Sequence, residues 1–201
     1  MGIFRRHRKH KRGLESYSYG DFLILYPLCA EKNSQELVAH LNSCERPGYL
    51  GDKEVPANLN GISYGVLDDL SRIGKGKDPL ASAIEIVLDM KSDEIYRLPV
   101  TKVFGFSNFV VKEVERINGL FSAIKLDHTS EEISAGIEQL NFGSFGVLDW
   151  YARRMRITNQ NEVRSVPWVR IYTCMKNDTE QAAYERRYNK VILDNAKRRK
   201  R

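Results

Sequence analysis

The stretch 107–124, SNFVVKEVERINGLFSAI, decides the fold class of this chain. Its apolar residues recur three and four positions apart, which is the spacing of one face of an α-helix. We therefore predict a long amphipathic helix. Its inward positions are Phe109, Val110, Val114, Ile117, Leu120, Phe121 and Ile124.

The same period continues on both sides of this helix after residue 60. It predicts helices at 63–73, 78–88, 130–142, 144–157, 166–175 and 179–197, and a helical turn at 92–98. Ser63 is placed to cap the first of them, and Pro79 fits a first turn. Short gaps between helices favour antiparallel neighbours. Residues 61–196 are therefore predicted to form an all-α domain, a helical bundle of about seven helices.

Residues 14–60 form a less regular N-terminal segment. Residues 16–27, SYSYGDFLILYP, are aromatic and branched-aliphatic, which indicates a strand or a packed extended segment. Residues 34–44 carry Leu37, Val38 and Leu41 at helical spacing, so one short helix is predicted there. Prolines and glycines in 45–60 indicate a loop or linker.

The composition bounds the class of protein. Of 201 residues, 42% are hydrophobic and 29% charged, which excludes collagen-like, low-complexity and wholly disordered chains. No apolar run approaches the ~18 residues of a membrane-spanning helix, and no secretory signal pattern follows the basic N-terminus. Three irregularly spaced cysteines, Cys29, Cys44 and Cys174, suit a reducing compartment better than a disulfide framework. We expect a soluble intracellular protein, or one assembled inside a cell.

Positive charge is concentrated at the two ends, in a basic arm (1–13) and a basic tail (197–201). The formal net charge is +6, but without these basic residues it is −5. Such ends suit polyanions, either DNA or acidic protein surfaces, although a solubilising role is the simpler alternative. The candidate polyanion-binding residues are Arg5, Arg6, Arg8, Lys9, Lys11, Arg12, Lys197, Arg198, Arg199, Lys200 and Arg201.

Motifs for catalysis and metal binding are weak. In GKGK, residues 74–77, Asp78 stands where a phosphate-binding loop needs Ser or Thr, so an interhelical loop is favoured. Cys29, His40 and Cys44 are three ligands where a tetrahedral zinc site takes four. The histidines are isolated, and no nucleophile motif is present. We therefore expect no enzyme, no metal site and no cofactor.

Two groups of residues invite a binding or pairing role. Arg164, Trp168, Arg170 and Tyr172 combine the residue types that dominate protein interfaces, and they suit a partner-docking surface or a core equally well. Asp149 lies between apolar residues of a predicted helix. We expect it to be buried and paired with Arg153 or Arg154.

Three stretches together resemble small helical structural or assembly proteins of tailed bacteriophages, in particular the crAss-like group that infects Bacteroidetes. They are 63–70 (SYGVLDDL), 141–155 (NFGSFGVLDWYARRM) and 166–174 (VPWVRIYTC). The first is also similar to the opening helix of phage tail assembly chaperones.

The resemblance implies a non-enzymatic virion protein near the portal, tail or packaged genome, in a particle assembled in the host cytoplasm. Its partners would be portal or tail subunits, DNA through the basic ends, and further copies of itself in a homo-oligomer, with no membrane partner. The alternative is a tail assembly chaperone that is not retained in the virion. A nucleic-acid-binding regulator is less favoured, because no helix-turn-helix with a basic recognition helix is evident.

Overall fold

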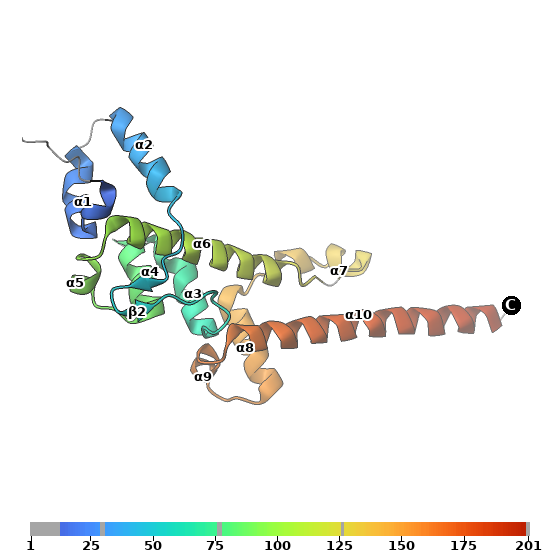
Figure 1. Cartoon of the computed structure of the whole chain (residues 1–201). Helices are drawn as coiled ribbons and strands as arrows, with labels where there is room; N and C mark the ends of the chain where they lie inside the picture. The colour runs from blue at the N-terminus through green and yellow to red at the C-terminus, as the bar shows by residue number, and fades with distance from the viewer. Residues whose placement is uncertain (1–12, 29–30, 76–77, 126, 200–201) are drawn as a thin grey trace, which may run out of the picture. The chain divides into compact units, whose positions relative to one another are not determined.

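The computed structural model describes residues 13–28, 31–75, 78–125 and 127–199. It is mostly helical, which confirms the all-α class (Figure 1). The α-helices are α1 (Tyr19–Leu25), α2 (Glu31–Asn42), α3 (Tyr64–Arg72), α4 (Pro79–Leu88), α5 (Ser92–Ile95), α6 (Val100–Ser122), α7 (Ser130–Ser134), α8 (Gly143–Met155), α9 (Gln160–Arg164) and α10 (Trp168–Arg199). Two short strands, β1 (Tyr49–Leu50) and β2 (Lys53–Glu54), pair antiparallel. Within the described part of the chain, no helix is long and apolar enough to cross a membrane.

The chain folds as two compact units. Unit 1 comprises the residues up to Ala57 together with Ile73–Val111, and unit 2 comprises Asn58–Arg72 together with Lys112 onward. The expected boundary near residue 60, with a single helical domain after it, therefore does not match the packing. Helices α4 and α5 belong with the N-terminal segment, and α6 contributes to both units.

Helix α1 corrects the expectation of an extended segment at residues 16–27. The Ser18 hydroxyl accepts a hydrogen bond from the Asp21 backbone N–H at 3.1 Å, and the Asp21 carboxylate accepts one from the Ser18 N–H at 3.3 Å. This reciprocal capping box satisfies two N–H groups that a helix start leaves unpaired. The aromatic and branched residues suit a strand, but the Ser-x-x-Asp signal outweighs them.

Asp78 has a structural role in unit 1. Its carboxylate caps α4 by accepting from the Ala81 N–H at 3.0 Å, and it also accepts from the Tyr19 hydroxyl at 2.7 Å. Burial and this hydrogen bond raise the pKa of Tyr19, so the phenol stays protonated and able to donate. The residue that breaks the phosphate-loop motif therefore joins α1 to α4.

The junction of α2 and α6 depends on close backbone approach within unit 1. The Asn108 side-chain amide donates to the carbonyls of Leu41, Asn42 and Cys44 at 3.0–3.2 Å. One turn earlier on α6, Gly105 faces the Glu45 carbonyl so closely that an added Cβ would overlap it. The glycine thus permits the chain that follows α2 to lie against α6.

Replacing Gly105 by Ala should destabilise the protein by about 1–3 kcal/mol, because the added methyl group displaces backbone and not a flexible side chain. Gly119→Ala in the same helix is the matched control, since nothing lies within 4 Å of its added Cβ. That control should gain up to about 1 kcal/mol of helix propensity. Urea denaturation of both variants measures the difference, and equal stabilities would contradict the close contact.

Helix α10 in unit 2 is one continuous helix where two were predicted. The expected break lay near residues 176–178, whose Asn and Asp are weak helix formers. Asp178, however, receives a bidentate hydrogen bond from Arg154 of α8 at 2.9–3.2 Å. Helix α9 was not predicted; the Asn159 side chain begins it by accepting from the Asn161 N–H at 3.0 Å.

Candidate interaction surfaces

Trp168 lies in the core of unit 2. Its side chain is 2% exposed, and its indole N–H donates to the Leu59 carbonyl at 2.8 Å. Its ring packs against Phe121 and Tyr172, with centroids 6.1 and 6.2 Å away. For Trp168 and Tyr172, the structure therefore favours the core interpretation over partner docking.

Arg164 is engaged by two carboxylates of α3. Its guanidinium donates to Asp68 at 3.0 Å and to Asp69 at 2.7 Å. Asp68 is only 7% exposed, and Arg72 also pairs with it at 3.0 Å. Gly65 permits this approach, because a Cβ there would lie 2.9 Å from the backbone of Arg164. Of the four predicted docking residues, only Arg170 has an exposed side chain.

Both backbone polar groups of Leu59, in unit 2, form hydrogen bonds with side chains. Its N–H donates to the Glu113 carboxylate at 2.9 Å, and its carbonyl receives the indole N–H of Trp168. Arg116 binds the same carboxylate at 2.8 Å and lies 5.9 Å from the Trp168 ring centroid. The hydrogen bond from Arg116, followed by that from Leu59, lowers the pKa of Glu113.

Trp168→Ala should cost about 3–5 kcal/mol, because it opens a cavity and leaves the Leu59 carbonyl with only the longer hydrogen bond from the Ile62 N–H, at 3.4 Å. Arg170→Ala, two residues along the same helix, should change stability by less than about 0.5 kcal/mol. Thermal or urea unfolding of the two variants distinguishes a core tryptophan from a docking one. A Trp168→Ala protein of full stability that only failed to bind a partner would contradict the core assignment.

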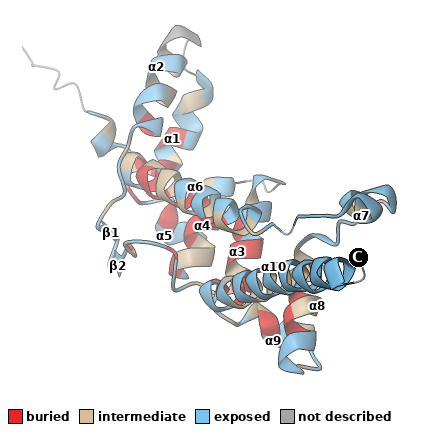
Figure 2. Cartoon of the chain, turned by 90° about the vertical axis from the view of Figure 1, so that its right-hand side faces the viewer, coloured by how far each residue is buried: buried red, intermediate tan, exposed pale blue. Residues whose placement is uncertain are grey.

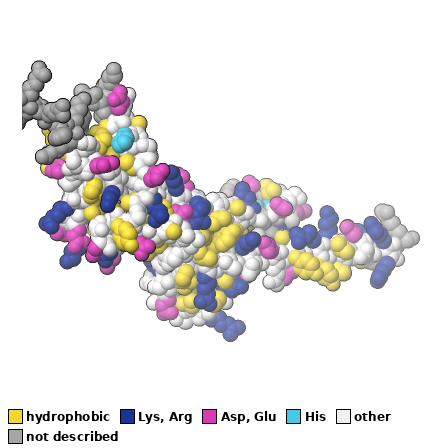
Figure 3. Space-filling view, in the orientation of Figure 1, with side chains coloured by type: hydrophobic (Ala, Val, Ile, Leu, Met, Phe, Trp, Pro, Cys, Tyr) yellow, Lys and Arg dark blue, Asp and Glu magenta, His cyan; other side chains and the backbone are white. Residues whose placement is uncertain are grey.

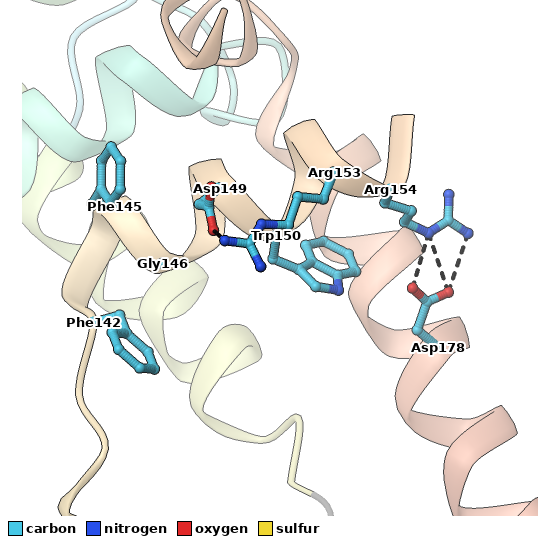
Figure 4. Close-up of a pocket in the computed structure, with 8 residues that line it drawn as sticks. All are labelled: Phe142, Phe145, Gly146, Asp149, Trp150, Arg153, Arg154 and Asp178. Carbon is cyan, nitrogen blue, oxygen red and sulfur yellow. Dashed lines mark hydrogen bonds and ion pairs between the residues drawn. The ribbon is translucent and has the colours of Figure 1, made fainter. Parts of the chain in front are cut away.

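An open groove of about 680 Å³ lies along α8 in unit 2. Figure 4 shows the residues that line it: Phe142, Phe145, Gly146, Asp149, Trp150, Arg153, Arg154 and Asp178. Phe142 and Phe145 are 71% and 60% exposed, which is high for large aromatic side chains. Exposed aromatic rings beside arginines have the composition of protein interfaces.

Ion pairs fix the polar side of this groove. Asp149 pairs with Arg153 at 2.8 Å, and Arg154 pairs with Asp178 at 2.9 Å. This decides between the two partners expected for Asp149. Its side chain is 27% exposed, so it is not the buried acid that was expected. The groove itself was not predicted, although the repeat of Phe142 and Phe145 before an Arg-Arg pair could have indicated it.

The basic tail is in part the end of α10. Lys197, Arg198 and Arg199 form the exposed last turn of the helix, where positive charge interacts favourably with the helix dipole. The predicted domain end at residue 196 therefore falls inside α10, which continues through Arg199. The six candidate residues of the basic arm, and Lys200 and Arg201, lie outside the described residues.

The second half of α10 exposes apolar side chains between its charged ones. Figure 2 shows this part of the helix as exposed, and Figure 3 shows hydrophobic side chains gathered there next to lysines and arginines. The apolar residues are Tyr184, Tyr188, Val191, Ile192 and Leu193, each 49–60% exposed. This segment and the α8 groove are the two candidate interaction surfaces of unit 2.

Among the described residues, no group of three or more His, Cys, Asp or Glu is arranged to hold a metal ion. Cys44 donates its thiol to the His40 carbonyl at 3.6 Å, and Cys29 lies outside the described residues. Comparison of the chain with protein-family models, with curated proteins and with solved structures gave no match.

Proposed function

We propose that this chain is a non-enzymatic structural component of a tailed-bacteriophage virion, placed near the portal, tail or packaged genome. It binds a neighbouring protein through the groove along α8, and its basic ends contact DNA or acidic subunits. The resemblance of residues 63–70, 141–155 and 166–174 to phage structural proteins supports the phage assignment.

The observation that carries the binding role is the exposure of Phe142 and Phe145 in the groove. Exposing two aromatic rings to water is unfavourable, at about 25 cal/mol for each Å² of apolar surface left uncovered. The neighbouring Arg153 supplies a charged donor at the rim. A partner that covers the rings and offers an acidic or carbonyl acceptor to Arg153 would bind there.

A tail assembly chaperone is the alternative function. It would use the same groove to hold a tail protein during assembly, and it would then be absent from the finished particle. The two functions differ in the fate of the protein and not in the chemistry of the groove.

Mass spectrometry of gradient-purified particles of the phage that encodes this chain should detect the protein in a fixed ratio to the major capsid subunit. A double variant, Phe142→Ser with Phe145→Ser, should reduce that ratio without altering protein stability, since both rings face solvent. Ile24→Ser on α1, where the side chain is 70% exposed, is the matched control. Presence in infected cells with absence from particles would support the chaperone instead.

Removing residues 1–12 and 197–201 should leave thermal stability nearly unchanged and strongly weaken binding to duplex DNA or to an acidic partner. The salt dependence of DNA binding should also flatten, by about 0.9 in slope for each phosphate that the trimmed protein no longer neutralises. A salt titration of the full-length and trimmed proteins measures both effects.

A narrower pair of variants tests the described end of α10. Alanine at Lys197, Arg198 and Arg199 should weaken DNA binding more than alanine at three other exposed lysines. Those control lysines are Lys53, Lys102 and Lys112. Equal affinities and salt slopes for the two triple variants would identify the tail as a solubiliser. For the truncated protein that lacks residues 1–12 and 197–201, a large loss of thermal stability would mean that the two ends are folded into the structure.

A further inference from the structure

Four exposed side chains in the second half of α10 form one stripe. Tyr184, Tyr188, Val191 and Ile192 are spaced by four, seven and eight residues from the first, which places them on one face of the helix. The rings of Tyr184 and Tyr188 stack with centroids 6.1 Å apart. Leu193 is exposed as well but lies outside this stripe.

The stripe faces away from the rest of unit 2. Arg186 marks the inward face, since it pairs with Glu132 of α7. Asp178, which precedes the stripe, is held by Arg154 of α8. Arg186 is two residues from both Tyr184 and Tyr188, and residues two apart on a helix do not share a face. A partner can therefore reach the stripe without displacing these ion pairs.

Charge along the helix indicates which partner fits. Acidic Glu180 and Glu185 precede or begin the stripe, whereas the basic last turn, 197–199, follows it. If α10 of a second copy ran parallel to α10 of the first, the acidic segments of the two helices would lie side by side, and so would their basic ends. A second copy aligned antiparallel sets the acidic segment of each helix beside the basic end of the other.

The charged residues beside the stripe also complement each other when two copies of α10 lie antiparallel. Arg187 and Asp194 are exposed, seven residues apart and therefore on one edge. When Tyr188 of one helix packs against Val191 of an antiparallel copy, Arg187 of each copy lies beside Asp194 of the other. Asn195 continues the stripe and comes level with the Tyr184 hydroxyl of the second copy.

We infer that two copies of this chain associate through the stripe of α10 as an antiparallel, two-fold symmetric helix pair. Such an interface is isologous, so each attractive contact occurs twice. A polar Asn within an apolar seam is a known means of fixing register. The seam is short and falls near or below the low end of standard interfaces, about 1,200 Å², so we expect dissociation at micromolar concentration.

Sedimentation equilibrium of the full-length protein across the micromolar range should show a reversible monomer–dimer equilibrium. Arg187→Glu should raise the dissociation constant about tenfold or more, because the introduced carboxylate of each copy then faces Asp194 of the other. Asp194→Arg should do the same by placing the introduced guanidinium of each copy beside Arg187 of the other. Circular dichroism checks that both variants keep the wild-type helix content.

An equimolar mixture of the two single variants supplies the decisive measurement. In a mixed dimer the introduced glutamate of one copy meets the introduced arginine of the other, and the second edge keeps its native Arg187–Asp194 pair. Association should therefore return to the wild-type strength. The double variant, Arg187→Glu with Asp194→Arg, should also dimerise like the wild type.

Three results would overturn the inference: a monomer at all concentrations, variants that dimerise as well as the wild type, or a mixture no stronger than its components. A monomeric wild type would leave the proposed virion role untouched, since that role depends on the α8 groove and the basic ends.

Discussion

The hydrogen bond from the Trp168 indole to the Leu59 carbonyl organises unit 2. It joins residues 109 positions apart in the sequence within a buried environment. A donor buried away from water is costly unless it is paired, so the indole N–H requires the Leu59 carbonyl, which also accepts a longer hydrogen bond from the Ile62 N–H at 3.4 Å. The Leu59 N–H is satisfied by Glu113 on the other side of the same peptide. The segment before α3, the second half of α6 and the start of α10 therefore meet at one backbone unit.

The buried carboxylate of Asp68 imposes a second constraint on the same unit. A charge at 7% exposure needs partners, and it has Arg72 from its own helix and Arg164 from α9. Arg164 reaches it because Gly65 leaves room for the backbone of α9. Two of the residues that the sequence suggested for partner docking, Arg164 and Trp168, therefore stabilise the fold instead, one through its charge and the other through its buried ring. Exposed aromatic residues available to a partner lie instead along α8 and in the second half of α10.

Sequence patterns predicted helices where local chemistry is sufficient. The apolar period of α6 and the Asp-Pro start of α4 depend only on residues within a few positions of each other. Long-range pairing explains the failures. The continuity of α10 through Asp178 depends on Arg154, 24 residues away. The burial of Trp168 depends on Leu59, which no spacing rule connects to it. The exposure of Phe142 and Phe145 depends on what the rest of unit 2 leaves uncovered, which helical spacing alone does not show.

The interleaving of the two units constrains how the gene could be divided. Residues 58–72 belong to unit 2, yet they interrupt the two parts of unit 1 in the chain, and α6 supplies residues to both. Any contiguous fragment that contains unit 1 complete also carries residues 58–72 of unit 2, and any fragment that contains unit 2 complete also carries residues 73–111 of unit 1. A single cut anywhere within α6 separates residues 58–72 from helices α7 to α10 of unit 2, so unit 2 could not be inherited, exchanged or expressed as a module free of unit 1.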